Sequence, residues 1–147
     1  MSYPKSVIKL AHDNAEAVCM RSARAIHEAG IKSFREIPLA DLALRLRVTF
    51  DEQVRYLEHQ DMDAWQKYSA EIVEDRIRRG MNASDVIQAG QIMLSALREF
   101  FASELGKVHM IEGREASKIL ERLEARIQGM NAIATAVATR VGVTRHK

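Results

Sequence analysis

The chain has 147 residues, of which 47% are hydrophobic and 29% charged, with a formal net charge of +2. This balance excludes a disordered tail, and the longest uncharged stretch, residues 127–139, is too short and too polar to cross a hydrocarbon layer about 30 Å thick. Cys19 is the only cysteine, and the first residues lack the basic-then-apolar order of a secretory signal. We therefore expect one cytoplasmic domain over residues 1–147.

Glycine and proline residues divide the chain into segments with helical periodicity. Residues 5–29 carry apolar and small side chains three and four positions apart, and Gly30 ends this first helix. Pro38 suits the first turn of a second helix, because its missing N–H is not needed there, and that helix runs to about His59. Both segments are predicted to be amphipathic helices that pack on a common core.

A third predicted helix carries a candidate pocket. It begins at Asp61 or Asp63, either of which can cap it, and it ends at Gly80. Aromatic side chains at helical spacing line a plain core more often than a ligand pocket, and a semi-buried arginine among them needs a carboxylate or carbonyl partner. The candidate pocket residues are Trp65, Tyr68, Ile72 and Arg76.

The last two predicted helices are rich in apolar residues. The fourth begins at Asn82 or Ser84 and ends at Gly106, and the fifth runs from Gly113 to about Arg140. The fifth carries an apolar ladder in steps of three and four that is longer than one small core requires. We therefore expect a homodimer, with an interface formed by Ile119, Leu123, Ile127, Met130, Ala134 and Val137.

The same helix carries four basic residues, each four positions from the next, which we call the basic ribbon: Arg114, Lys118, Arg122 and Arg126. Like charges at this spacing repel each other by a few tenths of a kcal/mol unless neighbouring groups compensate. One interpretation is a solvated helix face. The other is a surface that binds an acidic partner, and the ribbon is therefore a candidate partner-binding site.

The pattern as a whole predicts the fold class. No window shows sustained strand alternation, no segment repeats at a fixed period, and no linker is long enough to separate two domains. We expect an all-α fold, a single bundle of about five to six helices.

Motifs that carry catalysis are absent from the sequence. It contains no GxSxG, no GxxxxGK[ST], no HExxH and no CxxC. Cys19 falls beside the apolar stripe of the first helix, and we interpret it as a small core hydrophobe rather than a nucleophile. His12, Asp13 and Glu16 lie within about one helical turn, but exposed polar residues on one face usually meet water. We expect no enzymatic activity, no cofactor and no metal.

Three stretches in fixed order carry a resemblance to a known family. They are Phe34–Leu42, with an aromatic-x-x-x-Pro-Leu-x-x-Leu helix start, Tyr56–Asp61, with a Leu-x-x-x-Asp turn, and Trp65–Ile87, with an Arg-x-x-x-Gly ending before a new helix. The chain resembles the N-terminal sensory domain of RsbR-type stressosome co-antagonists. The resemblance implies a globin-like fold without haem and a dimer that signals through protein–protein contacts in the bacterial stress response. No output domain follows, so we expect the output partner to be another chain.

Two other functions stay open at this point. A haem-binding globin sensor shares the expected fold, but its proximal histidine belongs shortly before the fourth helix, and residues 65–80 contain none. A nucleic-acid-binding helical protein is suggested by the basic ribbon, although aromatic residues placed for base stacking are not evident. Both are weaker expectations than the non-haem sensory module.

Overall fold

The computed structural model describes residues 5–107 and 113–146, with side chains placed as far as Val141. The described residues form six α-helices and two short 3₁₀ turns and contain no strand, so the predicted all-α helical bundle is confirmed. The helices are α1 (Lys5–Asp13), α2 (Ala15–Glu28), α3 (Leu39–His59), α4 (Met62–Arg78), α5 (Ala83–Glu104) and α6 (Gly113–His146), and the 3₁₀ turns are η1 (Lys32–Phe34) and η2 (Leu105–Lys107).

The first predicted helix is two helices, and Asn14 separates them. The Asn14 side chain donates a hydrogen bond from Nδ2 to the carbonyl of Leu10 at 2.8 Å, and its backbone leaves the helical region with φ −113° and ψ 15°. Asparagine competes in this way for helix carbonyls, which is why it favours breaks and caps over helix interiors. The prediction of one continuous helix over residues 5–29 is therefore wrong.

The predicted helix boundaries at residues 60–82 are local features that the structure reproduces. Asp61 accepts a hydrogen bond from the backbone N–H of Ala64 at 3.0 Å, as expected of a cap. Gly80 has φ +94°, and the N–H of the next residue, Met81, donates to the carbonyl of Arg76 at 3.0 Å. This is the glycine-dependent helix ending in which the chain reverses within one turn. It fixes the last turn of α4, and with it the position of Arg76.

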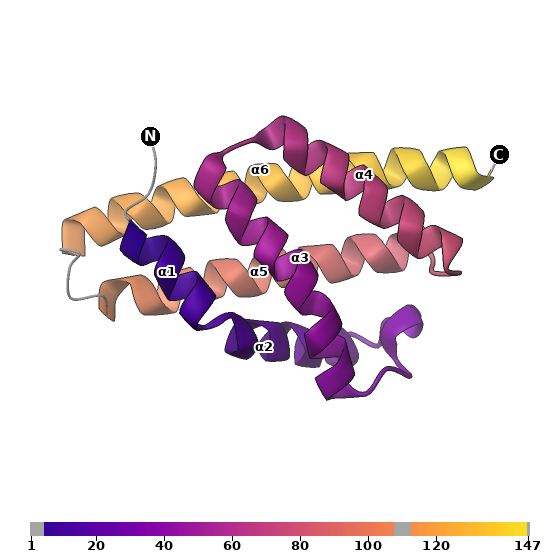
Figure 1. Cartoon of the computed structure of the whole chain (residues 1–147), viewed down its shortest axis with the longest axis horizontal. Coiled ribbons are helices and arrows are strands. Elements are labelled where there is room, and N and C mark those ends of the chain that lie inside the picture. Colours follow the sequence, from indigo (N-terminus) through magenta and orange to yellow (C-terminus); the bar gives the residue numbers. More distant parts are fainter. Residues whose placement is uncertain (1–4, 108–112, 147) are drawn as a thin grey trace.

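The helices are arranged around the long C-terminal pair. Figure 1 shows α5 and α6 side by side and antiparallel along the length of the molecule, with α4 on the C-terminal half of α6. The helices α2 and α3 pack against each other, and α2 also contacts α5. Four helices, α3 to α6, therefore surround the middle of the bundle, where the candidate pocket residues lie.

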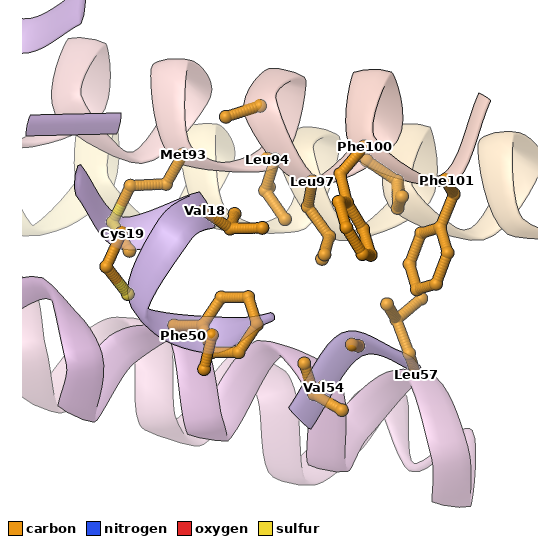
Figure 2. Packing of buried hydrophobic residues seen from close by; sticks show 14 of the residues in the cluster. Val18, Cys19, Phe50, Val54, Leu57, Met93, Leu94, Leu97, Phe100 and Phe101 are labelled. Carbon is orange, nitrogen blue, oxygen red and sulfur yellow. The ribbon is translucent and has the colours of Figure 1, made fainter. Parts of the chain in front are cut away.

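The core is continuous from α2 and α3 to α5. Figure 2 shows Phe50 and Leu57 of α3 facing Leu97 and Phe101 of α5, with Val18 of α2 between the two helices. Each of these five side chains is 0 to 3% exposed. Full burial of a side chain of this size contributes about 1.5–3 kcal/mol relative to leaving it in water. This apolar layer is what holds α2 and α3 onto the C-terminal pair.

The apolar ladder of α6 belongs to this same single-chain core. Ile119, Leu123 and Met130 are fully buried, Ile127 is 4% exposed, and Val137 is 2% exposed. Because α4 and α5 both pack on α6, they cover the ladder from within the chain. The predicted interface through Ile119, Leu123, Ile127, Met130, Ala134 and Val137 is therefore wrong, since all of these side chains are buried except Ala134, which is half-buried.

Candidate ligand-binding cavity

A cavity of about 100 Å³ lies among α3, α4, α5 and α6, and it is partly open to solvent. The four candidate pocket residues Trp65, Tyr68, Ile72 and Arg76 all line it. They come from successive turns of one face of α4, where spacings of three and four bring side chains into register. The structure thus brings together the residues that the sequence singled out.

The wall of the cavity is largely apolar and rests on an anchored indole. The Trp65 Nε1–H donates a hydrogen bond to the carbonyl of Met130 at 2.9 Å, and Trp65 is 3% exposed. Its ring lies 5.7 Å from the ring of Tyr68 and 5.5 Å from that of Tyr56. The bond ties α4 to α6 across the cavity wall. Leu46, from α3, adds a further apolar group to the lining.

Two buried polar atoms in the cavity lining have no hydrogen-bond partner in the part of the chain that the structure describes. They are Oε1 of Gln53 and Oγ of Ser69, and their residues are 1% and 3% exposed. A buried serine in a helix can donate to the carbonyl four residues earlier, as Ser22 does to Val18 at 2.9 Å. Ser69 makes no such bond. Each unsatisfied polar group costs about 1–3 kcal/mol.

Sequence reasoning missed Gln53 and Ser69. Gln53 interrupts the apolar stripe of α3 that runs through Leu46, Phe50 and Leu57, and a polar residue inside such a stripe is a signal that the sequence does contain. Ser69 gives no comparable signal, because serine is common on both faces of a helix. Only the packing of four helices reveals that both residues line one space and that their polar atoms are buried without a partner among the described residues.

Tyr68 contributes to the cavity lining an aromatic ring and a hydroxyl that is already hydrogen-bonded. The Tyr68 O–H donates to Oγ1 of Thr49 at 3.3 Å. Burial raises the pKa of Tyr68, with the carboxylate of Glu52 acting in the same direction, while the bond to Thr49 and the positive charge of Arg76 oppose the shift. The phenol is therefore neutral at physiological pH. Its remaining hydrogen-bonding capacity is that of an acceptor.

Two arginines stand in the lining at the exposed end of the cavity. The side chain of Arg76 is 28% exposed, and Arg45 is an exposed residue of α3. Arg76 Nη1 donates to Oδ2 of Asp75 at 2.8 Å, and the same oxygen forms an ion pair with Nε of Arg79 at 3.1 Å. No aspartate or glutamate is among the described lining residues. The lining therefore carries positive charge without a carboxylate of its own.

A second hollow lies next to the cavity, between α5 and α6. It is wider, about 320 Å³, and it is lined by several polar side chains, including Arg98, Glu124 and Gln128. None of its described lining residues carries an orphaned buried polar atom. A polar, open surface of this kind is satisfied by water.

The basic ribbon lies apart from the cavity. Arg114 and Lys118 are exposed on the N-terminal half of α6, whereas Arg122 and Arg126 are half-buried and each interact with another residue. The α6 residues that line the cavity are in the C-terminal half of that helix, from Asn131 to Ala138. The ribbon and the cavity are therefore separate surfaces.

Cys19 lies in the core, as a small apolar residue would. It is 2% exposed, and burial raises the pKa of its thiol from 9.0 to about 11, an effect that the charge of Arg47 only partly opposes. A nucleophilic cysteine needs a lowered pKa. The thiol is thus protonated at neutral pH and is held among hydrocarbon side chains.

Burial of the Cys19 thiol makes the stability of the domain depend on alkaline pH. Between pH 9 and about 11 the unfolded thiol ionises while the folded thiol keeps its proton, so the free energy of unfolding is expected to fall by up to about 1.4 kcal/mol per pH unit from this group. Urea denaturation across this range measures the slope. Cys19→Ala is the control, and an equally steep slope in that variant would contradict the assignment.

Among the side chains that the structure describes, in residues 5–107 and 113–141, no group of three or more His, Cys, Asp or Glu residues is placed to hold a metal ion. His12 and Asp13 end α1 while Glu16 lies in the first turn of α2, so the break at Asn14 divides these three residues between two helices. No histidine is among the described residues that line the cavity.

Comparison with family models, curated proteins and solved structures finds no match to this chain. Among the described helices, none has both the length and the apolar character that a membrane span requires. The functional assignment therefore rests on the cavity itself. It combines a largely apolar lining, two residues whose buried polar atoms have no partner among the described residues, and two arginines that reach solvent.

Proposed function

We propose that the protein is a non-enzymatic sensory domain that binds a small, largely apolar molecule in the cavity among α3, α4, α5 and α6. The observation that supports this most directly is the pair of orphaned polar atoms, Gln53 Oε1 and Ser69 Oγ, in an otherwise apolar lining. An amide oxygen only accepts hydrogen bonds, and a hydroxyl accepts and donates. Both atoms are shielded in this structure, so a ligand that carries a hydrogen-bond donor would reach them after a local side-chain adjustment, and it would then satisfy a group that has no partner among the described residues.

The size of the cavity limits the ligand. A cavity of about 150 Å³ takes up benzene, so a space of about 100 Å³ that is partly open accommodates one small ring or a short branched chain, with the rest of the molecule toward solvent.

The signalling part of the proposal rests on the resemblance to RsbR-type sensory domains. Side chains from four helices line the cavity, so an occupant contacts α3 and α4 on one side and α5 and α6 on the other. A ligand shifts the populations of two conformations only through its differential affinity for them. A site built from several helices changes shape when those helices move, so its affinity for a ligand can differ between the two conformations. We propose that the output is a protein–protein contact in the bacterial cytoplasm.

The proposed homodimer uses a different surface from the buried ladder. The outer face of α6 carries exposed small residues at helical spacing: Ala125, Gly129, Ala132 and Ala136. Small side chains allow two helices to approach to about 8 Å. We propose that a second copy of the chain packs its α6 on this face, which is continuous with the helix that lines the cavity.

Haem is the weaker alternative for the cavity. A globin-type haem needs a histidine that faces the iron, and the described lining has none. The half-buried His27 is engaged elsewhere, since its Nε2 lies 2.8 Å from the carbonyl oxygen of Ile37. The lining favours a small organic ligand over a macrocycle.

Phenol is expected to bind more tightly than toluene, which has the same ring and no donor. A net hydrogen bond contributes about 0.5–1.5 kcal/mol, so the expected ratio of dissociation constants is about three to tenfold. Isothermal titration calorimetry measures both ligands. Trp65 is the only tryptophan and lines the cavity, so its fluorescence is an independent reporter of occupancy.

Three variants test whether the preference for phenol over toluene arises from the buried polar groups of the cavity lining. Gln53→Met keeps the length of the side chain and removes one of the two acceptors, so the preference for phenol is expected to decrease, and the double variant Gln53→Met with Ser69→Ala is expected to bind phenol and toluene equally. Ser22→Ala removes a buried helix hydroxyl that already has a partner and does not line the cavity, so it is expected to keep the preference for phenol. Absence of saturable binding of either ligand, or equal binding to the wild-type protein, would contradict the proposed function.

A further inference from the structure

The positive charge of the cavity lining bears on the chemical class of the ligand. Arg45 and Arg76 line the space from two different helices, α3 and α4. Both are more exposed than Gln53 and Ser69, which places the cationic groups toward solvent and the orphaned atoms deep inside. The lining therefore combines two arginines that reach solvent with two buried residues whose polar atoms lack partners among the described residues, and the rest of it is largely apolar.

Arg76 is free to take a second anionic partner. Its hydrogen bond to Asp75 uses one N–H, on Nη1, and a guanidinium has five such donors. Asp75 also forms an ion pair with Arg79, which does not line the cavity, so Asp75 keeps a partner when Arg76 turns to a ligand. Arg45 forms no ion pair with any residue in the part of the chain that the structure describes.

We propose that the ligand is a small hydroxylated organic acid, with its carboxylate at Arg76 and Arg45 and its hydroxyl at Gln53 and Ser69. This inference rests on the proposed function, because it assigns the chemical class of the molecule that the cavity binds. Arginine favours carboxylates, since its planar fork of donors matches the two oxygens. The hydroxyl supplies the donor that the amide oxygen of Gln53 lacks.

The dimensions of the site favour a compact acid. The space of about 100 Å³ accommodates most of one aromatic ring of the ligand. The carboxylate of the ligand then lies where the cavity opens to solvent, and it keeps part of its hydration. A carboxylate that is only partly desolvated loses less of its hydration energy than a fully buried one. A long-chain acid would leave most of its hydrocarbon outside the cavity.

The test compares two ligands of similar size and shape, 4-hydroxybenzoate and 4-hydroxybenzyl alcohol. Both have the ring and the phenolic hydroxyl, and only the first carries a charge at neutral pH. We expect calorimetry to give about tenfold tighter binding of the acid, and the advantage is expected to decrease as the salt concentration rises. Arg76→Gln is expected to abolish the advantage, and Arg76→Lys to retain part of it.

Arg78→Gln is the matched control. It removes an exposed arginine of α4 that neither lines the cavity nor pairs with Asp75, so the preference for the acid is expected to persist. Circular dichroism checks that each variant is folded. If both ligands bind equally to the wild-type protein, the acid class is wrong while the proposed function stands. If neither ligand binds, and phenol does not bind either, both proposals fail.

Discussion

Replacing Ile127 with glutamate is expected to unfold the domain or to leave it marginally folded. Ile127 is 4% exposed and lies on the ladder that α4 and α5 cover. An unpaired carboxylate at such a position costs several kcal/mol, and domains of this size are stable by only about 5–15 kcal/mol. Urea denaturation followed by circular dichroism is expected to show a loss of at least about 3 kcal/mol.

Ala132→Glu is the matched control on the same helix. Ala132 is exposed, so its carboxylate stays in water and the free energy of unfolding is expected to change by less than about 0.5 kcal/mol. Sedimentation of this variant tests the proposed homodimer, because a charge on the outer face of α6 would separate the two copies. A stable, dimeric Ile127→Glu protein would contradict the core position of the ladder, and a monomeric wild type at micromolar concentration would contradict the dimer.

Truncation of Trp65 to alanine is expected to cost about 3–5 kcal/mol of unfolding free energy. The indole is 3% exposed, contacts the rings of Tyr56 and Tyr68, and donates to the carbonyl of Met130 on α6. Its removal leaves a large void between α4 and α6 and takes away the hydrogen bond from the indole N–H to the Met130 carbonyl. Chemical denaturation followed by circular dichroism measures the loss.

Trp65→Phe separates the two contributions of this residue. Phenylalanine keeps an aromatic ring in the wall and lacks the N–H, so a smaller loss is expected, about 1–2 kcal/mol from the hydrogen bond and the reduced packing. If Trp65→Ala were to cost less than about 1 kcal/mol, the indole would not be what ties α4 to α6. Equal losses in the two variants would assign the whole effect to the hydrogen bond.

The helix ends were predictable because each depends on a few neighbouring residues. Gly30 and Gly80 adopt positive φ, which glycine does without strain, and Asp61 and Asn82 satisfy backbone N–H groups within three residues of themselves. The break at Asn14 was also local, but a single asparagine in a helical pattern is compatible with continuation. Its side-chain bond to the Leu10 carbonyl decides the matter, and that bond is not visible in the spacing of apolar residues.

By itself, then, the sequence determined the helices from α3 onward, most of their ends, and the face of α4 that carries Trp65, Tyr68, Ile72 and Arg76, because helical periodicity and capping act over one or two turns. Only the tertiary structure decided which neighbouring helix covers the apolar face of each helix. An apolar ladder looks the same whether a neighbouring helix or a second subunit covers it, and the packing of α4 and α5 on α6 places Ile127 and Met130 inside the chain. The same packing left Gln53 and Ser69 without partners, because hydrogen bonding of a buried group depends on atoms that are distant in sequence.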